Sequence, residues 1–202
     1  LYTEPHIGIW VVGKQGRIFQ YEANRDDFKM VYKLPDTSEA ISCGYLDRNN
    51  NIWLCRKDTV LLYNIKDAHI VQFPNLLHSS ITAIEQVDKH HFFIATETGV
   101  RYVKLENGVL EAMPVETLDY FHAQVSELYF HRQLKRLFIG SFERGVFVYD
   151  MNTQEIIRPD ADLSDVNIAR ISPLNETELL IATEGMGVYK VDVRTCKLLH
   201  TL

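Results

Sequence analysis

The sequence lacks the features that mark several large classes of protein. Its 202 residues contain three cysteines, Cys43, Cys55 and Cys196, without C-x-x-C spacing, so neither a disulfide framework nor a cysteine zinc site is expected. No apolar run approaches the roughly 18 residues that suggest a membrane-spanning helix. No segment concentrates lysine and arginine, and the net charge is −6, so this segment is not expected to bind nucleic acid directly. The N-terminus carries no recognisable secretion leader.

Motifs of catalysis and metal binding are also missing. The eight histidines never fall in H-x-x-x-H or H-E-x-x-H spacing, and no serine has a G-x-S-x-G setting. The glycines at 185 and 187 lack the context of a phosphate-binding loop. The sequence therefore predicts no catalytic residue, no metal site and no cofactor.

What the sequence does contain is a repeat of about 42 residues. The apolar runs IWVVG, IWLCR, FFIAT, LFIGS and LLIAT recur at spacings of 43, 40, 45 and 42 residues. Each copy also has shorter apolar runs before and after this one, rich in β-branched and aromatic residues and bounded by turn residues, as in strands. A period near 42 with four strands per copy is typical of a propeller blade. We therefore predict an all-β protein, a β-propeller of five four-stranded blades.

The predicted propeller segment covers residues 1–202, and its blade boundaries follow from the repeat. The blades are expected at approximately 1–35, 36–74, 75–114, 115–159 and 160–202. Four of the five end in proline, which cannot donate to a strand ladder. We expect a helical turn within 115–124, and we expect the first blade to lack its innermost strand. Since no spare strand remains to complete a terminal blade, we expect a segment of a larger, for example seven-bladed, propeller; a closed five-bladed ring is the alternative.

Small residues recur at two positions of the repeat. Gly140 aligns with Cys55 and with two alanines, which suits a place where neighbouring blades converge. Gly145 aligns with Gly99 and Gly187, which would allow a positive φ or a close backbone approach. Cys43 and Cys55 flank a turn, so they are either two small buried side chains or a disulfide.

Two stretches, NNNIWLCRKDTVLLYN and RLFIGSFERGVFVYD, resemble the two-component regulator propeller repeat. That repeat reads roughly as a D-x-x-G turn, then I-W-[IV]-G-T, a gap, and G-[LI]-x-x-[YF]-[DN]. The resemblance extends over all five copies. It departs from the pattern in keeping the tryptophan only at positions 10 and 53, and in replacing the turn glycine.

The resemblance implies a function and a location. Proteins with this repeat are similar to the periplasmic sensor regions of Bacteroidetes hybrid two-component regulators, in which a further β domain, a membrane helix, a histidine kinase and a DNA-binding output follow. Many respond to oligosaccharides. We therefore expect a non-catalytic, extracytoplasmic sensor whose partners are an oligosaccharide, the remainder of the same chain and, in a homodimer, a second copy. It would meet the membrane only through other parts of the full-length protein.

The predicted ligand site consists of residues that break the repeat in the loops of one face. Aromatic planes beside arginine and carboxylate groups suit a sugar, since the rings stack on the sugar and the charges bind its hydroxyl or acidic groups. The structural alternative is that Arg56 pairs with a nearby acid and the aromatic residues pack on blade edges. The predicted residues are Arg56, Lys57, Tyr120, His122, Phe142, Glu143 and Arg144.

Two other function classes fit the repeat. One is a protein-interaction scaffold of the WD-repeat kind, because one fold hosts many functions. The other is a propeller lyase or hydrolase built on Glu97, Glu143 and Glu184, which occupy similar positions between the second and third strands. The structural interpretation of these three residues is that they are solvated loop residues.

Overall fold

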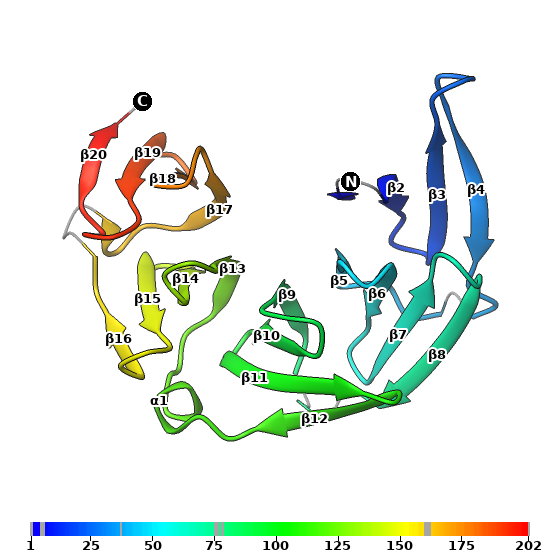
Figure 1. The fold of residues 1–202 in the computed structure, drawn as a ribbon, viewed down its shortest axis with the longest axis horizontal. Coiled ribbons are helices and arrows are strands. Elements are labelled where there is room, and N and C mark those ends of the chain that lie inside the picture. The colour runs from blue at the N-terminus through cyan, green and yellow to red at the C-terminus, as the bar shows by residue number, and fades with distance from the viewer. Residues whose placement is uncertain are drawn as a thin grey trace. The chain divides into compact units, whose positions relative to one another are not determined.

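The computed structural model describes residues 2–4, 7–36, 38–74, 77, 79–159 and 163–201. These residues form five four-stranded sheets and one short helix, as Figure 1 shows. In every sheet the strands lie side by side in chain order, and neighbouring strands are antiparallel. The all-β prediction is confirmed, and each predicted repeat copy contains one sheet.

Contacts divide the chain into two compact units. Unit 1 comprises Leu1–Ile81 and Glu106–Leu110, and unit 2 comprises Thr82–Leu105 and Glu111–Leu202. Unit 1 holds the first two sheets, and most of the other three belongs to unit 2. No helix in the described part of the chain has the length and apolar character needed to cross a membrane.

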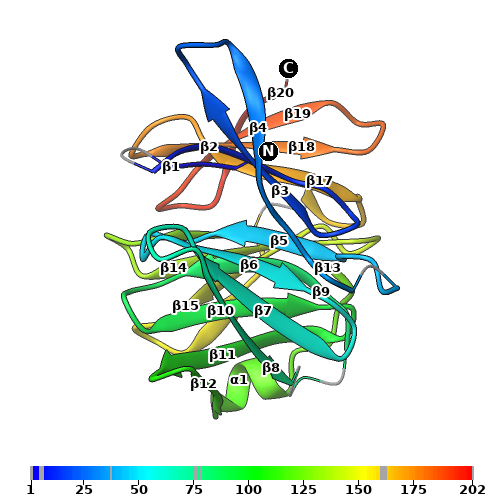
Figure 2. The same ribbon diagram turned by 90° about the vertical axis from the view of Figure 1, so that its right-hand side faces the viewer.

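The two sheets of unit 1 pack face to face, as Figure 2 shows. Trp10 and Ile18 of the first sheet meet Ile52 and Leu54 of the second in one buried cluster. The first sheet consists of β1 (Tyr2–Glu4), β2 (Gly8–Val12), β3 (Arg17–Glu22) and β4 (Asp27–Lys33), and the second of β5 (Cys43–Leu46), β6 (Asn51–Cys55), β7 (Thr59–Asn64) and β8 (His69–Pro74).

The prediction that the first sheet lacks its innermost strand was wrong. β1 pairs with β2 over three residues, with Tyr2 opposite Trp10 and Glu4 opposite Gly8. A three-residue strand leaves little sequence pattern, and Tyr-Thr-Glu contains no apolar run, so the repeat did not reveal it.

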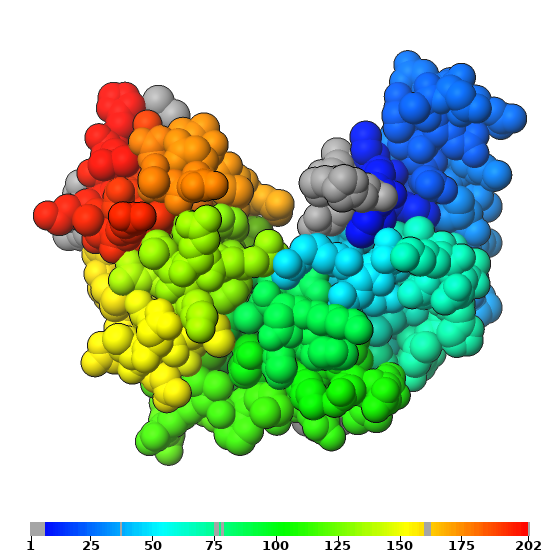
Figure 3. Space-filling view, in the orientation of Figure 1, coloured from blue at the N-terminus to red at the C-terminus, as the bar shows by residue number. Residues whose placement is uncertain are grey.

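In unit 2 the middle sheet lies between its two neighbours. Figure 3 shows this sheet in yellow-green and yellow, between green and orange segments. The third sheet consists of β9 (Ile81–Gln86), β10 (His91–Thr96), β11 (Gly99–Glu106) and β12 (Val109–Met113). The fourth consists of β13 (Val125–His131), β14 (Arg136–Ser141), β15 (Val146–Asp150) and β16 (Glu155–Ile157), and the fifth of β17 (Ile168–Pro173), β18 (Glu178–Thr183), β19 (Val188–Asp192) and β20 (Leu198–Thr201).

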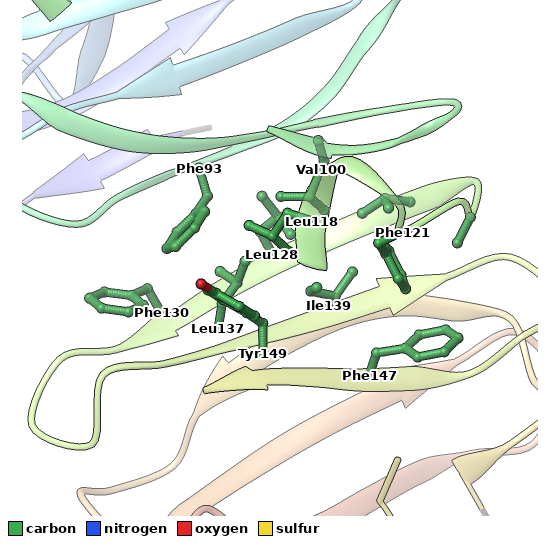
Figure 4. Packing of buried hydrophobic residues seen from close by; sticks show 13 residues of the cluster. Phe93, Val100, Leu118, Phe121, Leu128, Phe130, Leu137, Ile139, Phe147 and Tyr149 are labelled. Atoms are coloured by element: carbon green, nitrogen blue, oxygen red, sulfur yellow. The ribbon is translucent and has the colours of Figure 1, made fainter. Parts of the chain in front are cut away.

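The apolar runs of the middle sheet are explained by burial on both faces. Leu137 and Ile139 of β14 contribute to the core shared with the third sheet, which Figure 4 shows. Phe138, between them in sequence, contributes to the core shared with the fifth sheet. Since successive side chains of a strand point to opposite faces, a strand covered on both sides needs an unbroken apolar run.

The expected helical turn within 115–124 is confirmed. It is α1 (Glu116–Asp119), whose Leu118 is completely buried in the core shared with the third and fourth sheets. Helix α1 thereby ties the long connection before β13 to the sheets (Figure 4).

The repeated small residues have the packing roles that their alignment predicted. A Cβ added to Gly140 would come within 2.6 Å of Ile168 Cγ2 in the fifth sheet. At Gly145, where φ is +66°, an added Cβ would come within 1.7 Å of the Leu163 carbonyl oxygen. In unit 1, Cys43 and Cys55 lie opposite each other on β5 and β6 as free thiols. The contact with Cys43 and complete burial hold the pKa of Cys55 well above its ordinary value.

Candidate functional site

The predicted site residues of unit 1 serve local structure. Arg56 is only 7% exposed, its guanidinium donates to the Asp36 carbonyl, and its Nη1 lies 3.7 Å from the Asp36 carboxylate. The backbone N–H of Lys57 donates to the Glu39 carboxylate at 2.7 Å. Pairing of Arg56 with a nearby acid is what the structural alternative predicted, and these contacts hold Asp36 and Glu39 against the β6–β7 loop.

The other five predicted residues lie in unit 2. Three of them form the loop between β14 and β15, and backbone bonds fix this loop to its neighbours. The N–H of Phe142 donates to the Gln124 carbonyl at 2.9 Å, and the N–H of Glu143 donates to Asn167 Oδ1 at 2.7 Å. The N–H of Gly145 donates to the Val166 carbonyl at 3.0 Å. The loop is therefore hydrogen-bonded to the connections that precede β13 and β17.

Two arginines of unit 2 contact one aromatic ring. The guanidinium carbon of Arg144 lies 5.2 Å from the centre of the Phe147 ring, and that of Arg158 lies 4.1 Å from it. Cation–π contacts of this kind hold a guanidinium in place while it stays exposed. Phe147 in turn meets the Phe121 ring edge-on, with 4.9 Å between ring centres, and Figure 4 shows both rings. We call Phe121, Arg144, Phe147 and Arg158 the Arg–Phe cluster.

Hydrogen bonds orient the two guanidinium groups. Arg144 Nη1 donates to the His122 carbonyl oxygen, and Arg158 Nη1 donates to the Arg144 carbonyl oxygen at 3.1 Å. Tyr120, just before Phe121, is 77% exposed. The structure thus brings Arg144 together with the backbone of His122. It places Phe142 and Glu143 in the same loop as Arg144, and Tyr120 in the connection that carries Phe121.

Sequence reasoning missed Arg158 and Phe147. Phe147 lies in the repeated run GVFVY, which we interpreted only as a strand. Arg158 precedes Pro159, and the residues before the other three prolines are Leu34, Phe73 and Met113. An arginine where the other copies have an apolar residue is the signal that would have found it.

A cavity of about 260 Å³ lies beside Arg158. Arg158 and Lys197 are its charged lining residues, and Pro159, Thr195 and Cys196 complete it. A larger cavity, of about 460 Å³, is lined by residues of the β13–β14 and β17–β18 hairpins and by Glu85. At that cavity His131 Nε2 contacts the Glu176 carbonyl at 3.0 Å, and His131 Nδ1 accepts the Leu134 N–H at 3.3 Å. Both ring nitrogens are thus occupied by turn structure.

The three glutamates of the enzyme hypothesis are exposed side chains. The carboxylate of Glu184 accepts the side-chain amide of Asn167 at 3.2 Å, and the same Asn167 accepts the N–H of Glu143. Among the described residues there is no group of three or more histidine, cysteine or acidic side chains placed to hold a metal ion.

The most perturbed carboxyl group of unit 2 lies on β13. Burial raises the pKa of Glu127 to about 7, and Arg170, 3.4 Å away, opposes the rise. Sequence reasoning did not single out Glu127, because its desolvation comes from the packing of the fifth sheet against β13.

The stability of unit 2 should fall as pH rises because of Glu127. The pKa of Glu127 is 4.5 in the unfolded chain and about 7 in the folded one, so between pH 4.5 and pH 7 only the folded state keeps this proton. The contribution of Glu127 to the free energy of unfolding is therefore lost as the pH rises through that window. We expect Glu127→Gln to remove about 2 kcal/mol of this pH dependence. Urea denaturation followed by circular dichroism measures the free energy of unfolding at pH 5 and at pH 8. Glu155→Gln, in the same sheet, is the control. Equal pH dependence in the wild type and Glu127→Gln would show that the carboxyl is solvated.

A search against models of known protein families found no match, and a search of curated proteins found none either. The repeat and the site geometry are therefore the features that indicate a function for this chain.

Proposed function

We propose that this chain is a non-catalytic, extracytoplasmic sensor module of a bacterial two-component regulator. Its five sheets are blades of a β-propeller, it binds an oligosaccharide, and it passes the signal through the remainder of its chain to a histidine kinase. The resemblance of all five copies to the two-component regulator repeat supports the family, the periplasmic location and the ligand class. One four-stranded sheet per copy, with strands in chain order, is what propeller blades require.

The observation that carries the ligand proposal is the Arg–Phe cluster. Three residues, Phe142-Glu143-Arg144, separate Ser141 from Gly145, whereas only two separate the aligned Thr96 from Gly99 in the preceding copy. The arginine of this loop is exposed and oriented by Phe147 and by the His122 carbonyl. Binding residues on loops held by a rigid scaffold are a common arrangement. Tyr120 adds an exposed aromatic face of the kind on which sugar rings stack.

The signalling step in this proposal involves no bond chemistry. An oligosaccharide that contacts the β14–β15 loop and the connections around it would bind one arrangement of the full-length sensor, or one dimeric state, more tightly than another. The shift in population cannot exceed that difference in affinity.

A glycan array probed with the purified chain tests this function. We expect retention of oligosaccharides, weakened about tenfold by Arg144→Gln, which removes a charge-assisted donor from the site. Arg132→Gln, which changes an exposed arginine in the β13–β14 turn, is the matched control and should leave retention unchanged. Stable capture of a protein partner without retention of any glycan would contradict the sensor proposal and favour the interaction scaffold.

A further inference from the structure

The surface around Arg158 carries positive charge that described carboxylates leave unbalanced. Arg158 contacts the Phe147 ring and lines the cavity of about 260 Å³, whose other charged lining residue is Lys197. In the part of the chain that the structure describes, no ion pair joins Arg144, Arg158 or Lys197 to an acidic side chain. Three cations of this surface therefore have no ion-pair partner among the described carboxylates.

The acidic residue of the adjoining turn is already engaged. Asp192 Oδ1 accepts the N–H of Arg194 at 3.0 Å and both the N–H and the hydroxyl of Thr195, at 2.7 and 2.8 Å. These bonds hold the pKa of Asp192 below its ordinary value. The Asp192 carboxylate therefore stabilises the β19–β20 turn. Lys197, at the end of that turn, therefore faces the cavity without a carboxylate partner from it.

Both guanidinium groups keep most of their hydrogen-bonding capacity. A guanidinium has five N–H donors. Among the described residues, one donor of Arg144 bonds the His122 carbonyl oxygen, and one donor of Arg158 bonds the Arg144 carbonyl oxygen. The remaining donors form planar forks that match the oxygen pairs of a carboxylate or a sulfate. Two like charges held against one ring also repel each other, and an anion between them would relieve that repulsion.

We propose that the Arg–Phe cluster and the cavity of about 260 Å³ beside Arg158 bind the acidic group of a charged saccharide. The group is an oxyanion, either the carboxylate of a uronic acid or a sulfate ester. The volume of about 260 Å³ lies below the usual ~300–1,000 Å³ of pockets for drug-sized ligands, so it suits one charged sugar unit of a longer chain. The saccharide part rests on the proposed function, whereas the anion part rests on Arg144, Arg158 and Lys197.

Isothermal titration calorimetry at low ionic strength, with three oligosaccharides of matched length, tests the proposal. The ligands are an oligogalacturonide, a chondroitin sulfate oligosaccharide and a neutral malto-oligosaccharide. We expect at least one acidic ligand to bind at least tenfold more tightly than the neutral one, with an affinity that falls as salt is added. The carboxylated and sulfated ligands distinguish the two sources of the anion.

Variants assign the effect to the site. Arg158→Gln should weaken acidic binding about tenfold, and Lys197→Gln should weaken it by a smaller factor, while Arg132→Gln should leave it unchanged. In the wild type, the side-chain Nε–H signals of Arg144 and Arg158 should shift during the NMR titration, and this measurement does not depend on how a variant folds.

The possible failures are distinguishable. Equal affinity for acidic and neutral oligosaccharides, or unchanged acidic binding in Arg158→Gln, would overturn the anion proposal and leave saccharide binding intact. Binding of inorganic sulfate that requires Arg158, with no saccharide bound, would overturn the saccharide part and the proposed function while leaving the anion site.

Discussion

Replacement of Gly145 by alanine should destabilise unit 2 by about 3 kcal/mol, because two costs add. The backbone at Gly145 has φ +66°, which an L-amino acid with a side chain rarely adopts. The added methyl group would also lie 1.7 Å from the Leu163 carbonyl oxygen, with the Leu163 carbonyl carbon at 2.7 Å. Both obstacles are backbone atoms, so relief requires movement of residues 163–166 away from the β14–β15 loop.

Gly185 provides the matched control. It lies in the equivalent loop of the fifth sheet with φ +88°, but an added Cβ there would meet nothing within 4 Å. Gly185→Ala should therefore cost only the backbone strain, about 1 kcal/mol. Both tryptophans, Trp10 and Trp53, lie in unit 1, so unfolding of unit 2 should be followed by circular dichroism or hydrogen exchange. Equal losses in the free energy of unfolding in the two variants would mean that residues 163–166 move away from the added methyl group at no cost.

Gly145 also connects stability to the proposed binding surface. Its N–H donates to the Val166 carbonyl, and its neighbour Arg144 belongs to the Arg–Phe cluster. A displacement of residues 163–166 would shift the loop that carries Arg144. We therefore expect Gly145→Ala to weaken anion binding even under conditions where unit 2 remains folded, whereas Gly185→Ala should not.

The repeat predicted the sheets because blade architecture depends on local pattern. Runs such as LFIG and GVFVY are apolar because both faces of β14 and β15 are covered. Strands β6, β7 and β10 are buried in the same way, whereas β18 and β19 alternate between buried and half-buried residues. Gly145 was predictable for the same reason, since an equivalent loop recurs in three copies. Strand β1 was not predicted, because its three residues pair with β2 through backbone hydrogen bonds, which any sequence can form.

The candidate site was only partly predictable, because its contacts join residues that are far apart in the sequence of one copy. Arg144 was found as a departure from the repeat, but its orientation comes from the His122 carbonyl 22 residues away. Arg158 comes from the end of β16 and reaches a ring in the middle of the same sheet. Arg56, which looked equally exceptional in the sequence, is buried against Asp36. Departure from a repeat identifies a residue with a special role, and the structure is needed to decide whether that role is internal or at the surface.

Replacement of Asp47 by alanine should destabilise unit 1 by about 3 kcal/mol, since several buried donors lose their acceptor at once. Asp47 is completely buried. Its Oδ1 accepts the N–H groups of Asn49 and Asn51, each at 2.8 Å. Its Oδ2 accepts the Asn51 side-chain amide at 3.0 Å and the indole N–H of Trp53 at 2.9 Å. One carboxylate thus closes the β5–β6 turn and satisfies the largest side chain of β6.

Asp88 is the natural comparison, because it occupies the corresponding turn of the third sheet. It accepts the N–H groups of His90 and His91 at 2.8 and 2.9 Å, but its side chain is 55% exposed. Water can replace the lost acceptor there, so Asp88→Ala should cost about 1 kcal/mol.

A double-mutant cycle isolates the bond between Asp47 and the indole. Trp53→Phe removes the N–H while keeping an aromatic ring in the core, so Asp47→Ala should cost about 1–2 kcal/mol less in that background. Urea unfolding followed by tryptophan fluorescence reports every member of the cycle, because Trp10, which shares the unit 1 core, is present in all four. A coupling energy of zero would mean that the indole N–H finds another acceptor. The aspartate would then act on the β5–β6 turn alone, through the N–H groups of Asn49 and Asn51 and the Asn51 side-chain amide.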